Sequence, residues 1–418
     1  MVDGVPAETI ARAVGTPAYV YSAAAVRRRY RALGDAFASL SPLICYALKA
    51  NPNRAVCAVL AKEGAGAEVV SGGELRRALA AGFRADQIVF SGVGKTPDEL
   101  ALAVRAGVLA LNVESEEELS ALARLARRLG RRAAVSIRVN PGVEAGGHRY
   151  LATGHGGAKF GVDPAQALML CRRARRAPSL ELRGLHCHIG SQILSPRPYA
   201  KALGVVLGLV ERLAGQGVGL ELLDLGGGMG VRYEDELDTG RSRHRMGPGA
   251  RKAALDCAAL ARTVVAALRP WPRLRLVLEP GRTLTAEAGL LLTTVLYRKR
   301  VGSSRFIVVD AAMNDLARPA LYDAYHPVAP ARLSDAAEAV VDVVGPVCET
   351  GDVLARARRL PWLGAGEVLA VLKTGAYGFS MSSQYNSRLR APEVLVEGGS
   401  WRLIRKRETF EDLVRHER

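Results

Sequence analysis

The sequence predicts an α/β protein in which a (β/α)8 TIM barrel is followed by a mainly antiparallel β domain, a sandwich or barrel. Three observations predict this fold. Apolar strand candidates alternate with segments of helical period up to about residue 283, and valine-rich strand candidates with little helix follow. Unusual polar residues stand at the carboxyl ends of the first eight strand candidates, which is where barrel enzymes carry their active sites.

The eight strand candidates are short apolar runs. They lie at residues 43–49, 67–71, 87–91, 109–113, 133–139, 182–189, 221–225 and 275–279. Alanine- and leucine-rich segments with helical period, such as Gly73–Ala81 and Glu116–Leu129, separate them. Eight strands that alternate with helices indicate a closed parallel barrel. The alternative is a doubly wound open sheet, but no Gly-x-Gly-x-x-Gly motif follows the first strand to support it.

The rest of the chain is expected to form the β domain. Its strand candidates lie at residues 291–301, 305–309, 339–344, 368–373, 393–396 and 401–406. Their valine content favours antiparallel strands. We place the barrel at residues 25–283 and expect residues 1–24 to join residues 284–418. Within the N-terminal piece, a short strand at 16–21 precedes a helix whose N-cap is Ser22.

The chain carries 58 basic and 41 acidic residues, a formal charge of +17. Such an excess can indicate a nucleic-acid or anionic-membrane partner. Here the basic residues are mostly arginines spread over helical segments, and aromatic residues, which stack on single-stranded nucleic acid, make up only 5%. We therefore predict solvated helix faces and no nucleic-acid partner, with a mild preference for anionic small substrates.

Six cysteines lie far apart, with no Cys-x-x-Cys pair and no metal-ligand spacing. This usage is typical of free thiols in a reducing compartment, and no metal is expected. The chain does not begin with a basic stretch and an apolar core, and no apolar segment reaches membrane-spanning length. We expect a cytoplasmic protein without a membrane partner.

A lysine stands at the carboxyl end of the first strand candidate. Lys49 follows the apolar run at 43–48, and Asn51-Pro52-Asn53 ends the strand as a turn. Most lysines are solvated, so a lysine after an edge strand would be ordinary. At the end of a barrel strand, however, a lysine beside apolar walls can lose its proton and attack an aldehyde. Lys49 is therefore a candidate nucleophile.

Polar residues also end the other seven strand candidates. They are Glu68, Ser71, Ser91, Asn112, Glu114, Arg138, Asn140, His186, His188, Ser191, Asp224, Glu279 and Arg282. The glycines at 226–228 follow the seventh strand and would let backbone N–H groups approach an anion. In isolation they are equally consistent with a flexible turn, but phosphate sites recur after the last two strands of barrels.

A carboxylate, Glu279, stands at the end of the last barrel strand candidate. An acid such as Glu279 against the nitrogen of a pyridine ring keeps that nitrogen protonated, and the ring then accepts carbanion electrons better. A histidine such as His188 can stack on the ring, although a structural role is the simpler interpretation of one histidine. Lysine, carboxylate, glycine loop and histidine together predict a pyridoxal phosphate site.

Longer motifs make the chain resemble a known family. They are residues 46–53, 68–75 (EVVSGGEL), 138–141, 186–192 (HCHIGSQ), 223–228 (LDLGGG), 279–282 (EPGR), 313–322 (MNDLARPALY), 348–352 (CETGD) and 375–386 (GAYGFSMSSQYN). Together they resemble the fold-type III pyridoxal phosphate decarboxylases over nearly the whole chain. Members that act on ornithine, arginine or carboxynorspermidine share the barrel motifs, whereas MNDLARPALY resembles the diaminopimelate branch.

The resemblance implies a role for each motif residue around the cofactor. Lys49 would be the Schiff-base lysine, His188 would stack on the ring and Glu279 would bind the ring nitrogen. The residues around the phosphate and the reacting carbon would be Ser191, Gly228, Gly281 and Arg282.

The resemblance also implies a substrate site. Its substrate-holding residues would be Arg282, Arg318, Tyr322, Glu349 and Tyr377, of which Tyr377 would touch the cofactor as well. Cys348 would donate the proton that follows loss of carbon dioxide. Cys348 and Glu349 would come from the neighbouring subunit, so a homodimer with active sites at its interface is expected.

Physical chemistry agrees with these roles. A substrate with an amino-acid group at each end has a distal carboxylate, and the guanidinium forks of Arg282 and Arg318 match it. Cys348 follows the apolar run Val343–Val347, which we expect to shield the thiol and keep it protonated. The expected reaction is the decarboxylation of meso-diaminopimelate to L-lysine.

Two alternatives stay open. A related decarboxylase would act on another amino acid or on an aminoacyl group tethered to a carrier protein, for which the basic charge is suitable. A non-catalytic pyridoxal phosphate carrier would resemble the barrel alone, whereas this chain continues for more than a hundred residues beyond it. The charged stretch at 235–249 is expected to be a mobile loop of unassigned function.

Overall fold

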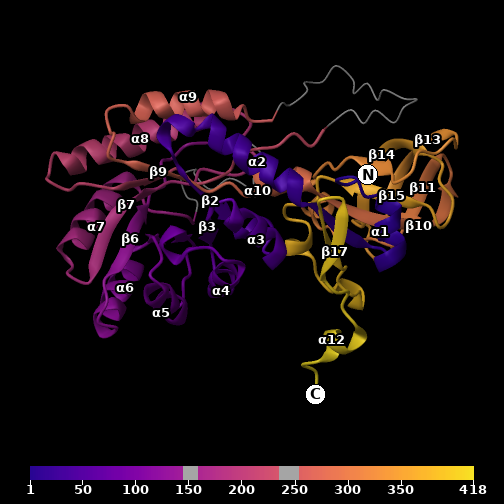
Figure 1. Cartoon of the computed structure of the whole chain (residues 1–418), viewed down its shortest axis with the longest axis horizontal. Coiled ribbons are helices and arrows are strands. Elements are labelled where there is room, and N and C mark those ends of the chain that lie inside the picture. The colour runs from indigo at the N-terminus through magenta and orange to yellow at the C-terminus, as the bar shows by residue number, and fades with distance from the viewer. Residues whose placement is uncertain (145–158, 235–253) are drawn as a thin grey trace. The chain divides into compact units, whose positions relative to one another are not determined.

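The computed structural model describes residues 1–144, 159–234 and 254–418. The chain divides into two compact units (Figure 1). The barrel unit contains residues 29–231 and 253–283, and the β unit contains residues 1–28, 232–252 and 284–418. The boundaries of the folding domains at 25 and 283 stay a prediction. The expected loop at 235–249 lies outside the described residues.

The barrel unit is a closed parallel barrel, as the sequence predicts. Its strands follow the chain in order and are β2 (Leu43–Ala47), β3 (Gly66–Val69), β4 (Ile88–Phe90), β5 (Ala110–Val113), β6 (Ala133–Arg138), β7 (Leu180–His186), β8 (Leu222–Asp224) and β9 (Arg275–Leu278). The last strand pairs with the first in parallel register, with Leu43 opposite Val277, and this pairing closes the ring. All strand carboxyl ends therefore meet at one rim.

Helices follow the strands and surround them (Figure 1). They are α2 (Ala23–Ala36), α3 (Arg54–Lys62), α4 (Gly72–Ala81), α5 (Pro97–Ala106), α6 (Glu116–Arg128), α7 (Pro164–Arg176), α8 (Arg197–Ala214), α9 (Cys257–Leu268) and α10 (Arg282–Thr285). Helix α4 shows why they begin where they do. The Ser71 hydroxyl accepts a hydrogen bond from the N–H of Glu74, and the Glu74 carboxylate accepts one from the N–H of Val70.

Small and apolar side chains fill the barrel interior. Leu43, Cys45, Val89, Ala110, Leu222 and Val277 form one buried cluster drawn from five strands. Gly184 on β7 is a point of close packing, because a Cβ there would lie 2.1 Å from the carbonyl oxygen of Leu222. The interior is thus a packed core, and the open space lies at the rim.

The β unit is built on a nine-stranded sheet, mainly antiparallel as predicted. Its strands are β1 (Ala18–Ser22), β10 (Gly289–Val301), β11 (Ser304–Val309), β12 (Val328–Pro330), β13 (Glu338–Val344), β14 (Val353–Pro361), β15 (Val368–Leu372), β16 (Glu393–Glu397) and β17 (Ser400–Arg405). The N-terminal strand joins this sheet as expected, because β1 lies between β10 and β16. Ser22 is the expected cap, since its Oγ accepts a hydrogen bond from the N–H of Ala25.

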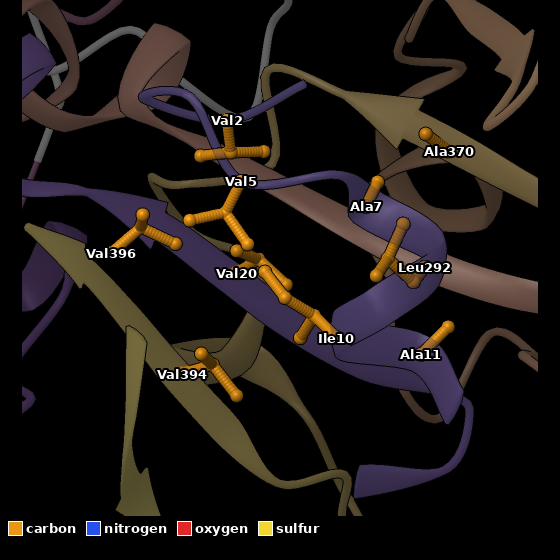
Figure 2. Close-up of a cluster of buried hydrophobic side chains, with 10 residues drawn as sticks. All are labelled: Val2, Val5, Ala7, Ile10, Ala11, Val20, Leu292, Ala370, Val394 and Val396. Carbon is orange, nitrogen blue, oxygen red and sulfur yellow. The ribbon is translucent and has the colours of Figure 1, made fainter. Parts of the chain in front are cut away.

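A short N-terminal helix, α1 (Ala7–Val14), covers part of this sheet. Ile10 and Val5 pack on Val20 of β1, beside Val394 and Val396 of β16 (Figure 2). Strand β14 was not expected, because arginines alternate along Val353–Pro361 and obscure its apolar residues. In the described parts of the chain, no helix has both the length and the apolar character needed to cross a membrane.

Candidate active site

A cavity of about 420 Å³ opens at the carboxyl rim of the barrel unit. Its lining residues are Lys49, Glu68, Val70, Ser91, Gly92, Val93, Gly94, Arg138, Phe160, His186, His188 and Glu279. They come from the ends of different strands, and three of the predicted cofactor residues are among them. The size suits a small organic ligand.

Lys49 lies in a single 3-10 turn, Leu48–Ala50, directly after β2. Its Nζ donates hydrogen bonds to both carboxylate oxygens of Glu68, at 3.0 and 2.9 Å. Burial raises the pKa of the Glu68 carboxyl, and the charge of Lys49 offsets part of that rise. The ion pair favours the protonated amine, so Lys49 must pass its proton to another group before it can act as a nucleophile, and this role stays a prediction.

Glu279 stands at the centre of a buried acidic cluster. Its Oε2 lies 3.3 Å from Nε2 of His186, and its Oε1 has no hydrogen-bond partner among the described residues. Burial alone would raise the pKa of Glu279, but His186 and Lys49 hold it below its ordinary range. Burial and the charge of Glu279 raise the pKa of neighbouring Asp224 well above its usual value. The two pKa shifts have opposite directions, as expected for neighbouring buried acids that favour a single negative charge between them.

These three residues are also the one group in the described ranges with metal-ligand spacing. Ligand atoms of His186, Asp224 and Glu279 lie within 4.8 Å of one another. A protonated Asp224 would be a poor ligand, because metal ligands must be deprotonated. The expectation of no metal stays a prediction.

His188 presents a neutral imidazole to the cavity. Its Nδ1 accepts a hydrogen bond of 3.1 Å from the N–H of Gly227, so the proton of the neutral ring lies on Nε2. Burial, together with the charges of Lys49 and Arg138, lowers the pKa of His188 well below its usual value. A flat uncharged ring is suited to stacking on an aromatic ligand.

The glycines at 226–228 are required by close packing. Gly226 and Gly228 have φ of +67° and +89°, and a Cβ on Gly227 would lie 2.1 Å from the carbonyl oxygen of Glu279. Nearby, the Arg282 guanidinium donates a hydrogen bond of 3.1 Å to Oγ of Ser191. Gly281 lies against the end of β2 and the turn that follows it, where a Cβ would meet Ala50 and Ala47 at 3.0 and 3.1 Å. Close packing therefore fixes these two turns, and their place around a phosphate stays a prediction.

Several residues that line the cavity were given no role from the sequence, among them Arg138 and Phe160. Arg138 makes a 2.9 Å ion pair with Glu114, and its guanidinium lies 4.8 Å from the centre of the Phe160 ring. Arg138 was visible as a polar strand end, and that position was its signal. Phe160 follows an undescribed stretch, and no sequence pattern marked it.

The other predicted residues belong to the β unit. Arg318 and Tyr322 begin and end α11 (Arg318–Tyr322), and Tyr377 has a left-handed φ of +58°. Cys348 lies in the turn after β13 and is exposed, so the expectation that Val343–Val347 shields its thiol is wrong within one chain. The reason is that β13 ends at Val344, and Cys348 lies in the bend at residues 346–349 outside the sheet.

Cys348 and Glu349 are tied to one loop of the β unit. The N–H of Cys348 donates a hydrogen bond of 3.0 Å to the Asn386 side chain, and Tyr385 donates one of 3.2 Å to Glu349. Both residues of this turn stay exposed. The contacts hold the turn in place without covering the thiol.

The cavity has the chemistry that pyridoxal phosphate requires. It offers an amine, an ionised carboxylate whose Oε1 is buried without a hydrogen-bond partner in the described ranges, and a neutral imidazole. A parallel barrel with these groups at its rim defines a class of enzymes, the barrel-type pyridoxal-dependent decarboxylases. Residues 23–286 match the family described as "Pyridoxal-dependent decarboxylase, pyridoxal binding domain".

Full-length relatives narrow the assignment. A diaminopimelate decarboxylase from Pseudomonas aeruginosa is 48% identical over 414 residues, 98% of this chain and 95% of the relative. One from Aquifex aeolicus is 45% identical over 99% of this chain and 94% of its own length. The crystal structure of the Helicobacter pylori enzyme with L-lysine has a TM-score of 0.91 at 40% identity, with 98% of each chain covered. The chain belongs to the diaminopimelate decarboxylase family.

Proposed function

We propose that this enzyme decarboxylates meso-diaminopimelate to L-lysine and carbon dioxide. The observation that carries the proposal is the pairing of Lys49 with an ionised, half-paired Glu279 in one cavity of the barrel unit, in a chain of this family. Bound pyridoxal phosphate supplies an electron sink for the bond that breaks. We expect the enzyme to work in the cytoplasm.

The barrel residues would hold the cofactor. Lys49 would bind its aldehyde carbon, Glu279 would accept the hydrogen bond of the ring nitrogen, and His188 would stack on the ring. Its phosphate would lie among Ser191, Gly228, Gly281 and Arg282. An ionised Glu279 would keep the ring nitrogen protonated, and Glu68 could take the proton that Lys49 must lose before it attacks.

The product defines what the substrate site must recognise. L-Lysine keeps the L-configured end of the substrate, so the carboxylate that leaves is at the D-configured end. The retained end has a carboxylate and an ammonium group. We assign the carboxylate to Arg282 and Arg318 and the ammonium to Glu349, with Tyr322 and Tyr377 beside them.

The proton that replaces carbon dioxide would come from Cys348. The Cys348 thiol and the Glu349 carboxylate are exposed on the isolated chain. In a water-filled site, solvent would protonate the carbon that loses carbon dioxide without control. We propose that two copies assemble as a homodimer and that each copy supplies Cys348 and Glu349 to the site of the other.

One substrate panel tests the function. Release of labelled carbon dioxide is measured from meso-diaminopimelate, L-lysine, ornithine, arginine and a glutamyl carrier protein. The proposal predicts that kcat/KM for meso-diaminopimelate is at least about a hundredfold above kcat/KM for the other compounds. Those compounds lack the distal carboxylate or place it poorly in the substrate site. Turnover of the carrier-bound substrate alone would establish the alternative function instead.

A further inference from the structure

In the β unit, Arg318 lies in a buried cluster with His326 and Tyr233. Arg318 is 4% exposed and His326 is fully buried. One terminal guanidinium nitrogen of Arg318 lies 2.8 Å from Nε2 of His326, and the guanidinium carbon lies 4.6 Å from the centre of the Tyr233 ring. Tyr233 also packs edge-to-face on His326, with ring centres 5.2 Å apart. Two rings thus contact one guanidinium, one through a hydrogen bond and one through its face.

The partners of His326 fix its protonation state. Its Nδ1 lies 2.9 Å from the carbonyl oxygen of Leu372, which can only accept a hydrogen bond, so Nδ1 carries a proton. Its Nε2 faces a guanidinium, which can only donate. Nε2 therefore accepts from Arg318, and His326 is a neutral imidazole in a single tautomer. A protonated His326 would lose this bond and place a second positive charge beside the guanidinium.

The end of strand β15 holds both rings. Leu372 is its last residue, and its N–H donates a hydrogen bond of 2.8 Å to the carbonyl oxygen of Pro327, next to His326. The following residue, Lys373, donates from Nζ to the carbonyl oxygen of Arg232, next to Tyr233. Pairing of β12 with β15 thus sets the place of His326, and a lysine at the end of the same strand sets the place of Tyr233.

We propose that His326 is the positioning residue that aims Arg318 at the carboxylate of the retained L-amino-acid end, with Tyr233 fixing the plane of the guanidinium. This inference rests on the role that the proposed function gives to Arg318. A guanidinium fork binds a carboxylate in its own plane, so a group that fixes this plane raises the affinity for carboxylate-bearing ligands. Fixing this plane does not change the affinity for a ligand without a carboxylate.

L-Lysine and cadaverine separate these two cases, because they differ only in the carboxylate. Both are titrated calorimetrically into the cofactor-loaded enzyme. In His326→Phe, which removes the acceptor, we expect the Kd of L-lysine to rise about tenfold or more and that of cadaverine to change less than about twofold. His326→Gln, which has both an acceptor and a donor, should recover most of the loss. His416→Gln, a change at an exposed histidine near the C-terminus, is the matched control and should bind like the parent.

A second variant keeps the test decisive if His326→Phe does not fold. Tyr233→Leu removes the stacked ring and should raise the Kd of L-lysine about threefold or more, again without a change for cadaverine. In each folded variant that binds L-lysine more weakly, KM for meso-diaminopimelate should also rise, whereas kcat should stay nearly constant. Equal shifts for both ligands, or no rise in the Kd of L-lysine in Tyr233→Leu, would overturn the inference. Failure of the parent enzyme to decarboxylate meso-diaminopimelate would instead count against the proposed function, since lysine binding is measured without turnover.

Discussion

The barrel unit and the β unit present their functional side chains in different ways. In the barrel unit, Lys49, Glu68 and Glu279 are brought to one cavity by three strand ends, and each has a charged or hydrogen-bonding partner there. In the β unit, Arg318 is buried among aromatic rings whereas Cys348 is exposed in a turn. We therefore expect the barrel unit to hold the cofactor, and we propose that the substrate-binding groups of the β unit need a covering partner.

The largest effect is expected from the barrel unit. Lys49→Ala should lower kcat/KM about 10⁴-fold or more, because the covalent attachment of the cofactor is lost. The visible absorbance that borohydride would bleach in the parent should be absent. Lys62→Ala, at an exposed lysine of α3, is the control and should keep both activity and absorbance. A visible absorbance of the parent that borohydride does not bleach would contradict the role of Lys49.

Glu279 should matter for turnover more than for cofactor attachment. Glu279→Gln replaces an ionised acceptor with a neutral amide, and we expect kcat to fall about a hundredfold to a thousandfold while the Lys49-linked absorbance persists with a shifted maximum. Absorbance spectra and steady-state rates are measured together. Glu221→Gln, at a surface ion pair with Arg183, is the control. An unchanged kcat in Glu279→Gln would remove the carboxylate from the mechanism.

The exposed thiol of the β unit can be tested by mixing two inactive proteins. Lys49→Ala and Cys348→Ser should each have little activity. If Cys348 serves the site of a second copy, subunit exchange should restore about a quarter of the parent activity, because half of the dimers are mixed and one site in each is intact. No recovery after proven exchange would mean that Cys348 acts within its own chain or not at all.

The smallest effect concerns stability in the barrel unit. Burial and the charge of Glu68 raise the pKa of Glu74 from 4.5 to about 7. An acid with a raised folded pKa binds its proton more tightly in the native state, so its contribution to stability falls as pH rises from about 4.5 to about 7. Glu74→Gln should therefore gain stability relative to the parent over that range, by about 1–3 kcal/mol in urea unfolding. Glu117→Gln, at an exposed glutamate, should show no such trend.

Sequence reasoning succeeded where local pattern determines the structure. Apolar runs and their polar ends predicted all eight barrel strands and the rim at which the site lies. The partner of Lys49 could not be predicted, because the contact with Glu68 depends on the register between β2 and β3. Strand β14 was missed because exposed arginines interrupt its apolar pattern. His326 and Tyr233 carry no motif signal, since their relation to Arg318 arises only when distant segments fold together.

The claim that separates the two units is that the barrel unit makes the cofactor site and Arg318 selects the substrate. Arg318→Met tests it most directly, with the absorbance of the bound cofactor and KM for meso-diaminopimelate measured on the same sample. The account predicts an unchanged absorbance spectrum and a KM raised about a hundredfold, because a bidentate charge-assisted contact is lost. A lost cofactor spectrum, or an unchanged KM, would contradict it.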